Sequence, residues 1–329
     1  MRLTPLEGRI YLAIPGLEDH LRAELPPPEG VSVRAAAGLL PSDSAQPPAL
    51  SAGDLVNQRF VVSSNPPAEV FWCQDAWLEP FRLEFGSINE AARALRDIQR
   101  NWAPVLFTQF RRGALIQEKL PPLQSKPRPF PWLLPDSPLG AWTLLDAHTL
   151  VGSARCESPF PGGVIRFEED RRGPPSRAYL KLQEALVRCR KWPAPGDRCL
   201  DAGASPGGWT WVLARLGAQV TAVDRAPPDR RILALEAVRY LRHDAFTLPC
   251  EDLGPQDWVF SDVVCYPPRL LEWIEKWLAS GLCENFVCTV KFQGCADDAV
   301  IRRFAALPAG RLVHLYHNKH ELTWIRAGG

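Results

Sequence analysis

The chain has 329 residues, of which 46% are hydrophobic and 23% are charged, with 38 basic and 37 acidic side chains. This length corresponds to about two domains, and the hydrophobic content is enough for two packed cores. No apolar stretch is long enough to cross a bilayer, and the first residues lack the apolar core of a signal peptide. The composition therefore argues against a membrane protein, and we expect a cytoplasmic chain.

The nine cysteines are odd in number, and no two of them form a C-x-x-C pair. This spacing argues against both a disulfide framework and a zinc knuckle. Reduced and mostly buried thiols are the simpler interpretation. The acidic residues are scattered and offer no convincing metal cluster, so we expect no metal site.

The positive charge is concentrated in residues 151–191, which carry nine basic and five acidic side chains, whereas the segments before and after them are slightly acidic. Such a stripe could neutralise the phosphates of a nucleic acid. From charge alone, a solvated helix face explains it equally well. The basic residues concerned are Arg171, Arg172, Arg177, Lys181, Arg188, Arg190 and Lys191.

Residues 1–110 are predicted to form an α+β domain of ferredoxin-like type, because short apolar strands alternate with helical patterns. The predicted strands are 9–14, 31–36, 59–63 and 105–110, and the predicted helices are 17–25 and 88–102.

Residues 111–175 are predicted to form a linker followed by irregular structure. Seven prolines between residues 121 and 138 preclude a regular helix or a central strand. A hairpin is expected from strands 141–147 and 149–156, and a basic loop rich in Gly and Pro from 157 to 175.

From residue 176 to 329, helices and strands alternate, which is typical of a doubly wound, Rossmann-like α/β sheet. The predicted strands are 198–201, 220–223, 258–261, 286–291, 312–317 and 321–326. The predicted helices are 177–190, 208–216, 229–238, 268–279 and 297–306. Polar residues at the carboxyl ends of these strands are the best candidates for ligand binding.

A glycine-rich turn runs from Asp201 to Trp209, between a predicted strand and a predicted helix. Its pattern is neither the dinucleotide fingerprint nor the phosphate loop that ends in Gly-Lys-Ser/Thr, so neither NAD nor ATP is favoured. A nucleoside that is linked to methionine and has no phosphates fits better. The sequence therefore indicates S-adenosyl-L-methionine.

Two aspartates at the ends of the next two strands are further candidates for binding the cofactor. Asp224 closes the second strand, where an acidic side chain can accept hydrogen bonds from ribose hydroxyls. A helix N-cap before Pro227-Pro228 is its alternative role. Asp244 follows the third strand and could accept a hydrogen bond from the adenine amine, although an isolated aspartate there is more often a turn residue.

Asp262 and Lys291 close two neighbouring apolar strands. A lysine at the end of a buried strand is costly unless it is paired or functional, because desolvation disfavours its charged form. A purely structural ion pair is the alternative. Lys181, on a predicted helix, and Glu321, at the start of the last strand, are unremarkable singly.

Taken in order around the glycine-rich turn, Lys181, Asp262, Lys291 and Glu321 resemble the Lys-Asp-Lys-Glu tetrad of FtsJ-type ribose 2'-O-methyltransferases. The resemblance covers residues 176–329. Segments 15–18, 23–24, 176–185 and 206–210 are most similar to the large-subunit rRNA cytidine enzymes of this class, which add ferredoxin-like and THUMP modules. Residues 111–140 are too short and proline-rich for a complete THUMP module, so we expect a reduced one.

The resemblance implies that Lys291 is the general base, that Asp262 orients its amine, and that Glu321 positions Lys181 or the target ribose. It implies an RNA substrate, with a cytidine of 23S rRNA as the expected target. The expected cofactor-binding residues are Asp201, Gly203, Ser205, Pro206, Gly207, Gly208, Trp209, Asp224, Asp244 and Asp262.

Other functions stay open. Residues 262–268 resemble the Asn/Asp-Pro-Pro-Tyr site of enzymes that methylate base amines, although the residue order differs, and Cys265 could serve a 5-methylcytosine enzyme. The 5-methylcytosine hypothesis leaves Lys291 unexplained. A non-catalytic rRNA-binding factor with a methyltransferase fold and a small-molecule methyltransferase are further alternatives, and the basic segment disfavours the last of these.

Overall fold

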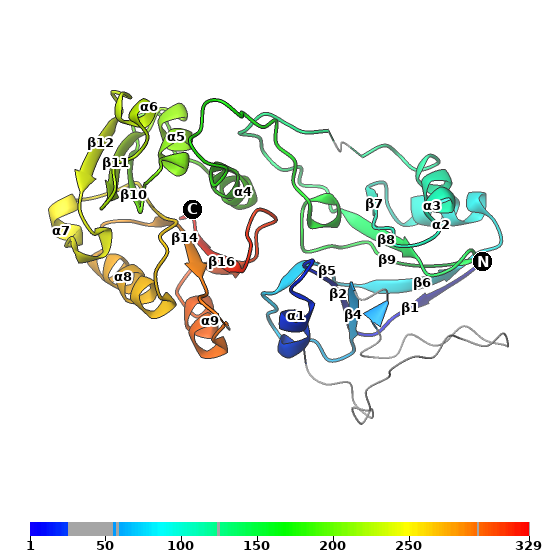
Figure 1. Ribbon diagram of the computed structural model, residues 1–329. Coiled ribbons are helices and arrows are strands. Elements are labelled where there is room, and N and C mark those ends of the chain that lie inside the picture. Colours follow the sequence, from blue (N-terminus) through cyan, green and yellow to red (C-terminus); the bar gives the residue numbers. More distant parts are fainter. Residues whose placement is uncertain (26–54, 57–58, 124–125, 295, 329) are drawn as a thin grey trace. The chain divides into compact units, whose positions relative to one another are not determined.

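The computed structural model describes residues 1–25, 55–56, 59–123, 126–294 and 296–328. The chain forms two compact units, Met1–Ser125 with Asp136–Val164 and Lys126–Pro135 with Ile165–Gly329 (Figure 1). Among the described residues, no helix combines the length and the apolar character that a membrane span requires. The strand predicted at 31–36 lies outside the described residues.

The first unit contains two sheets that pack face to face. The five-stranded sheet has the order β1 (Arg2–Pro5), β6 (Pro80–Glu84), β9 (Thr149–Ser153), β8 (Gly140–Leu144) and β7 (Trp102–Pro104). The four-stranded sheet has the order β3 (Leu55–Val56), β4 (Phe60–Ser63), β2 (Arg9–Ala13) and β5 (Cys73–Trp77). Trp77 from one sheet and Val151 from the other share a buried apolar cluster, which joins the two layers.

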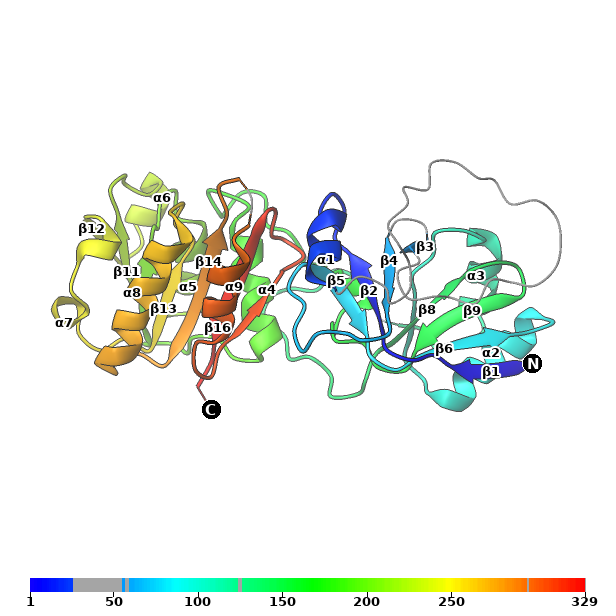
Figure 2. The same cartoon turned by 90° about the horizontal axis from the view of Figure 1, so that it is seen from below.

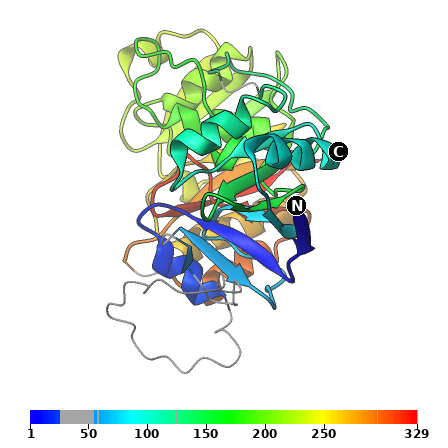
Figure 3. The same cartoon turned by 90° about the vertical axis from the view of Figure 1, so that its right-hand side faces the viewer.

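Helices cover the outer faces of both sheets of the first unit. Helices α2 (Ile88–Ile98) and α3 (Phe110–Gln117) contribute Leu95 and Ile116 to the core over the five-stranded sheet. Helix α1 (Glu18–Glu24) contributes Leu21 to the core over the four-stranded sheet. Figure 3 shows α1 in blue and the teal helices α2 and α3 on opposite sides of the strands.

The first unit differs from the expectation in three respects. The predicted strand 105–110 is wrong, because β7 ends at Pro104 and α3 begins at Phe110. The expected single ferredoxin-like layer is instead divided between two sheets. The expected boundary at residue 110 falls inside the unit, since the predicted hairpin, β8 and β9, pairs with β7 and β6. A 3-10 helix, η1 (Pro161–Gly163), closes the unit.

The second unit contains a seven-stranded sheet, and the predicted Rossmann-like architecture is confirmed. The strand order is β12 (Val238–Arg242), β11 (Gln219–Asp224), β10 (Arg198–Ala202), β13 (Trp258–Ser261), β14 (Asn285–Lys291), β16 (Glu321–Arg326) and β15 (Arg311–Val313). Strands β10 to β14 are parallel, and β16 runs antiparallel to both of its neighbours.

Helices lie on both faces of this sheet (Figures 1 and 2). Helices α4 (Tyr179–Cys189) and α5 (Gly208–Arg215) cover one face, and α8 (Pro267–Ser280) and α9 (Asp298–Ala305) cover the other. The shorter elements are α6 (Arg230–Leu233), α7 (Cys250–Leu253) and the 3-10 helix η2 (Ala245–Thr247). Pro267 and Pro268 occupy the first turn of α8, where a missing amide costs no hydrogen bond.

Two predicted elements of this unit are wrong in extent. The helix expected at 229–238 is only α6, and residue 238 already begins β12. The strand expected at 312–317 stops at Val313. The backbone amides of Tyr316 and His317 donate to the carboxylate of Glu184 on α4 and not to a neighbouring strand, which explains the early end.

The strand order brings the candidate residues to one edge of the sheet. The chain runs from β10 through β11 to β12 at one edge and then returns to β13, on the other side of β10. The carboxyl ends of β10 and β13 therefore flank the switch point of the sheet. Lys291 ends the parallel strand β14 at this edge. Because β16 is antiparallel, its first residue, Glu321, pairs in register with Lys291.

Candidate active site

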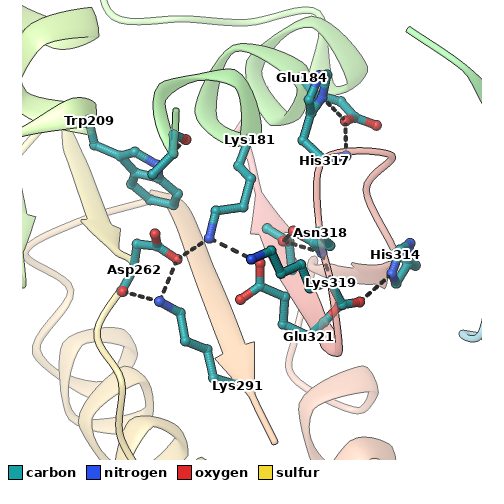
Figure 4. Close-up of polar contacts among 12 residues, drawn as sticks. Lys181, Glu184, Trp209, Asp262, Lys291, His314, His317, Asn318, Lys319 and Glu321 are labelled. Carbon is teal, nitrogen blue, oxygen red and sulfur yellow. Dashed lines mark hydrogen bonds and ion pairs between the residues drawn. The ribbon is translucent and has the colours of Figure 1, made fainter. Parts of the chain in front are cut away.

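Four charged side chains from different elements meet at the carboxyl edge of the sheet (Figure 4). Lys181 Nζ of α4 lies 2.7 Å from Asp262 Oδ1 and 3.0 Å from Glu321 Oε1. Lys291 Nζ donates to the backbone carbonyl of Asp262 at 2.6 Å and lies 3.1 Å from Asp262 Oδ1. All four residues predicted as catalytic are thus brought together, around a single carboxylate.

The cluster is paired and largely withdrawn from water. The side chains of Lys181, Asp262 and Glu321 are 10%, 14% and 12% exposed, and that of Lys291 is 19% exposed. Two ammonium groups face two carboxylates, so no charge of the cluster is left uncompensated, as burial requires. Lys291 is the most exposed of the four and has the easiest access for a ligand.

Helix α4 carries a second buried ionic group one turn after Lys181. The Glu184 side chain is fully buried, and its Oε1 accepts hydrogen bonds from Arg188 Nε at 2.9 Å and from the Tyr316 amide at 2.8 Å. Its Oε2 accepts from His317 Nδ1 at 2.8 Å and from the His317 amide at 3.1 Å. Residues three apart lie on the same helix face, so Glu184 and Lys181 face the same neighbours.

These donors stabilise Glu184 as a carboxylate. Burial by itself would raise the pKa of Glu184, but the positive charge of Arg188 and the hydrogen bonds from His317 and Tyr316 hold this pKa below its ordinary value. The carboxylate therefore fixes residues 316–317, the part of the chain that leads to Glu321.

Further hydrogen bonds order the same loop. Asn318 Nδ2 donates to the Glu321 carbonyl and to Thr323 Oγ1, both at 3.1 Å. His314 Nε2 lies 2.9 Å from the Lys319 carbonyl, and burial lowers the pKa of His314 to about 4. The imidazole is thus neutral at pH 7 and donates from Nε2. Figure 4 shows these side chains beside Glu321.

The glycine-rich turn is packed closely against its neighbours. Gly203 and Gly207 have φ angles of +83° and +109°, which favour glycine. A Cβ at Gly203 would overlap the side chain of Val263, and one at Gly207 would lie 2.8 Å from Cγ1 of Ile232. Gly208 begins α5 against Ser176. These positions explain why the turn needs glycine.

Three other residues of the turn connect it to the surrounding chain. The Pro206 carbonyl accepts a hydrogen bond from the Asp229 amide at 3.0 Å, and Ser205 Oγ donates to the Pro227 carbonyl at 3.2 Å. Trp209 is buried, and its Nε1 donates to the Ala178 carbonyl at 2.9 Å. Trp209 therefore joins the start of α5 to the start of α4.

Asp224 joins the end of β11 to the turn. Its Oδ2 accepts from the Ser205 amide at 3.0 Å, and its Oδ1 accepts from the Ala226 amide at 2.9 Å. Each oxygen keeps a further lone pair for a ligand hydroxyl. The N-cap of α6 is Asp229 and not Asp224, so the alternative capping role is wrong.

Asp244 is already surrounded by donors. Its Oδ2 accepts from Arg269 at 2.8 Å and also from Arg225, and its Oδ1 accepts from the Phe246 amide at 3.1 Å. Burial raises the pKa of Asp244, but the two arginine hydrogen bonds more than offset this and lower it. The residue also caps η2. Its expected contact with adenine stays a prediction.

Asp201, a predicted cofactor-binding residue, is buried, and its contact with the cofactor stays a prediction. Its side chain accepts a hydrogen bond of 2.6 Å from Thr210 Oγ1 of α5. Burial raises the pKa of Asp201 to about 7, and the negative charge of Asp262 acts in the same direction. This hydrogen bond links β10, which precedes the glycine-rich turn, to α5, which follows it.

The predicted basic stripe does not form one surface. Arg188 is paired with Glu184 inside the unit, Arg177 pairs with Glu169 at 3.0 Å, and Arg190 donates to the Pro135 carbonyl. Cys265, the nucleophile of an alternative hypothesis, is buried, and this burial raises the pKa of its thiol to about 11. A thiolate is therefore disfavoured there.

Sequence reasoning missed Glu184, His317 and Asn318. Glu184 lies in a helix whose sequence, Tyr179–Cys189, gives no sign that a charged residue would be fully buried. Its spacing of three residues from Lys181 is the one signal that could have indicated it.

The sequence of the second unit matches a known enzyme family. A model of the FtsJ-like methyltransferase family matches residues 174–304. Ribosomal RNA large subunit methyltransferase M of Xanthomonas campestris pv. campestris (strain B100) is 30% identical over 258 residues, which cover 73% of this chain and 70% of that protein. The enzyme of the same name from Alkalilimnicola ehrlichii is 36% identical over 195 residues, or 54% of this chain and 52% of that protein.

The match thus spans about half the length of the Alkalilimnicola relative and more of the Xanthomonas one. Among solved structures, the magnesium protoporphyrin IX methyltransferase of Synechocystis is similar to 46% of this chain and 79% of its own, with 19% identity and a TM-score of 0.34.

Proposed function

Because the chain belongs to the family of ribosomal RNA large subunit methyltransferase M, we propose that it transfers a methyl group from S-adenosyl-L-methionine to a ribose 2'-hydroxyl of 23S rRNA. The observation that carries this proposal is the cluster of Lys181, Asp262, Lys291 and Glu321 beside the glycine-rich turn. The target nucleotide that the resemblance implies is a cytidine. An rRNA substrate supports the expected cytoplasmic location of the activity.

The chemistry requires a base and accurate placement of the hydroxyl. When bound, S-adenosylmethionine supplies a methyl group activated by a sulfonium. A ribose hydroxyl is a weak nucleophile, so the protein must orient it and accept its proton. Lys291 Nζ is the group for this task, because it is the most exposed nitrogen of the cluster and is held at two points by Asp262. With its own proton released, Lys291 Nζ would accept the 2'-hydroxyl proton as the 2'-oxygen bonds to the methyl carbon, the bond between that carbon and the sulfonium sulfur would break, and S-adenosylhomocysteine would leave.

Lys181 and Glu321 hold the cluster in position. Lys181 lies between Asp262 and Glu321, and it shares Asp262 Oδ1 with Lys291. The Asp262 carboxylate is therefore not available to Lys291 alone. These contacts support positioning roles for Lys181 and Glu321 at the edge of the sheet where we propose that the ribose binds.

The turn and its neighbours fit the cofactor in the chemistry of their donors and acceptors. Asp224 has acceptor capacity at the carboxyl end of β11, where ribose hydroxyls bind in such sheets. Asp244 is the acceptor for the adenine amine, which would replace one of its arginine donors. We assign Gly203, Ser205, Pro206, Gly207 and Gly208 to the surface that contacts the cofactor, and Asp201 and Trp209 hold this turn through hydrogen bonds with Thr210 and Ala178.

Labelled methyl transfer tests the proposal. The full chain is incubated with radiolabelled S-adenosylmethionine and unmodified 23S rRNA transcribed in vitro, and the RNA is then digested in alkali. A 2'-O-methyl group blocks cleavage of the adjacent phosphodiester, so we expect the label in an alkali-resistant dinucleotide. Label in a mononucleotide would indicate a base methyltransferase, and the absence of label would favour a non-catalytic binding factor.

Calorimetry tests the cofactor site separately. Wild-type protein should bind S-adenosylmethionine, and Asp224→Ala should weaken this binding about tenfold, the effect of losing one or two hydrogen bonds to a ligand. Equal binding by both proteins would contradict the assigned position of the ribose.

A further inference from the structure

Five aromatic rings form a continuous series in the second unit, and we call them the aromatic track: Phe130, Trp132, Phe167, His317 and Tyr316. The Phe167 ring centroid lies 4.9 Å from that of Trp132 and 6.3 Å from that of Phe130. It also lies 5.8 Å from that of His317, which is 5.1 Å from that of Tyr316. The track therefore connects the proline-rich segment 126–135 to the loop that precedes Glu321.

The end of the track at Tyr316 is held close to the catalytic cluster. The Tyr316 amide donates to Glu184 Oε1 at 2.8 Å, and Glu184 lies one helical turn from Lys181. Lys181 in turn contacts Glu321, five residues after Tyr316. Both ends of segment 316–321 are thus anchored on α4, within about one turn, or 5 Å, of each other along the helix.

The ring of Tyr316 packs on His317 but is only partly covered. The residue is 45% exposed, whereas Phe167 in the middle of the track is 5% exposed and belongs to the core. Trp132 is partly exposed. Core packing therefore explains the centre of the track but not the exposed aromatic ring at its end beside the active site. The buried Glu184 carboxylate holds the Tyr316 backbone amide and so fixes the position of this partly exposed ring, as a platform for a stacked base requires.

Basic residues lie on the same segments as the rings of the track. The Arg128 guanidinium lies 5.9 Å from the Trp132 ring centroid. Backbone hydrogen bonds, from the Arg128 amide to Arg166 and from the Glu168 amide to Arg128, fix this part of segment 126–135. Arg166, Lys319 and Lys126 are exposed. Stacking surfaces combined with arginine and lysine are what proteins use to bind single-stranded RNA.

We propose that the aromatic track binds the single-stranded RNA next to the target nucleotide, with a flanking base stacked on Tyr316 and its phosphates near Arg128 and Lys319. This inference rests on the proposed function. It adds a surface outside the catalytic cluster and gives segment 126–135 a role in substrate binding. Binding there would place the target ribose because Tyr316 and Glu321 share their anchor on α4.

Two variants at one position test the stacking. Tyr316→Phe keeps the ring, whereas Tyr316→Leu keeps an apolar side chain without a ring. Steady-state methylation of unmodified 23S rRNA is measured for both, together with S-adenosylmethionine binding. We expect Tyr316→Leu to raise the KM for RNA about tenfold, the loss expected for one stacked base, with cofactor binding unchanged. Tyr316→Phe should stay close to wild type.

Equal KM values for wild type, Phe and Leu variants would overturn the proposal. A Leu variant that loses kcat and cofactor binding together would also overturn it, because that result indicates a structural role. If wild type methylates the RNA and Tyr316→Leu is unaffected, only this inference fails. If wild type itself transfers no methyl group, the proposed function fails.

The phosphate contacts have an independent readout. Lys319 is exposed, so Lys319→Ala should fold normally, and it should lower the slope of log Kd against log salt for the same RNA by about 1. Arg302→Ala, on the surface of α9, is the matched control and should leave the slope unchanged. Equal slopes for Lys319→Ala and wild type would show that Lys319 does not contact the RNA phosphates.

Discussion

Helices α2 and α4 each have eleven residues, but they bury different kinds of side chain. The buried residues of α2 are Ala91, Ala92, Ala94 and Leu95. Helix α4 buries Lys181, Gln183 and Glu184 together with its apolar residues. The first helix follows the ordinary amphipathic pattern, with its charged residues in water. Helix α4 buries charged side chains, which oppositely charged side chains from other elements must compensate.

The two helices contribute to different properties of the protein. Apolar burial in α2 stabilises the first unit and demands no particular partner. The buried charges of α4 are costly unless paired, and their partners, Asp262, Glu321 and His317, come from the far end of the chain. Helix α4 therefore organises a site, whereas α2 completes a core. Substitutions in the two helices should separate these roles.

The largest effect is expected for Lys181→Ala. This change leaves Asp262 and Glu321 close together without the ammonium group between them, and breaking a buried pair costs about 3–5 kcal/mol. Methyl transfer to 23S rRNA should fall at least about 100-fold, because Asp262, which holds Lys291, is no longer fixed by Lys181. Kinetics and thermal unfolding of the full chain check both effects. A variant with wild-type kcat would show that α4 has only a structural role.

Glu184→Gln is expected to have the next largest effect. Glutamine keeps the volume but places an amide group among four donors, so the loop before Glu321 should loosen and kcat should fall about tenfold. The control is Leu95→Ala in α2, which should destabilise the first unit by about 2–5 kcal/mol without changing kcat. If the two variants lowered kcat equally, the contrast between the helices would be wrong.

Asp201→Asn should change the pH dependence of stability. The folded-state pKa of about 7 exceeds the ordinary value of 3.8, so the folded protein binds this proton more tightly than the unfolded chain. The resulting stabilisation is present below the unfolded pKa and is lost as pH rises through about 7. Asparagine cannot ionise, so the variant should lose less stability than wild type between about pH 5 and pH 8, as measured by urea unfolding. Parallel curves would contradict the raised pKa.

The smallest effect is expected at the start of α2. Ser87 caps this helix by accepting a hydrogen bond of 3.2 Å from the Glu90 amide. Ser87→Ala should destabilise the first unit by about 1 kcal/mol and leave methyl transfer unchanged. Thermal unfolding and the rRNA assay measure the two quantities. A loss of activity here would mean that α2 also contributes to the site.

The candidate site of the second unit could be predicted where a charged residue stands at the end of an apolar strand. Asp224, Asp262 and Lys291 all follow apolar runs, and the structure places them where a parallel sheet requires. The loop 314–320 was not predictable, because its conformation depends on the side chain of Glu184, more than 130 residues away. Local pattern carries no information on such a contact.

The first unit was less predictable because its strands are short. Strands β1 (Arg2–Pro5) and β6 (Pro80–Glu84) each contain a proline and pair with strands distant in sequence. The place of β6 depends on the apolar cluster that Phe81 and Leu83 share with α2, and β1 is positioned by its pairing with β6, so neither follows from local alternation. The linker 126–135 was correctly expected to be irregular, but its association with the second unit depends on the Phe167 ring and could not be read from prolines.

The central claim is that Lys291 accepts the proton of the ribose hydroxyl. The most direct measurement is the single-turnover rate of methyl transfer to 23S rRNA by Lys291→Ala, with S-adenosylmethionine binding measured in parallel by calorimetry. Loss of a general base should slow transfer about 100- to 10,000-fold while the cofactor Kd stays at its wild-type value. A variant that binds the cofactor normally and transfers the methyl group at the wild-type rate would contradict the account.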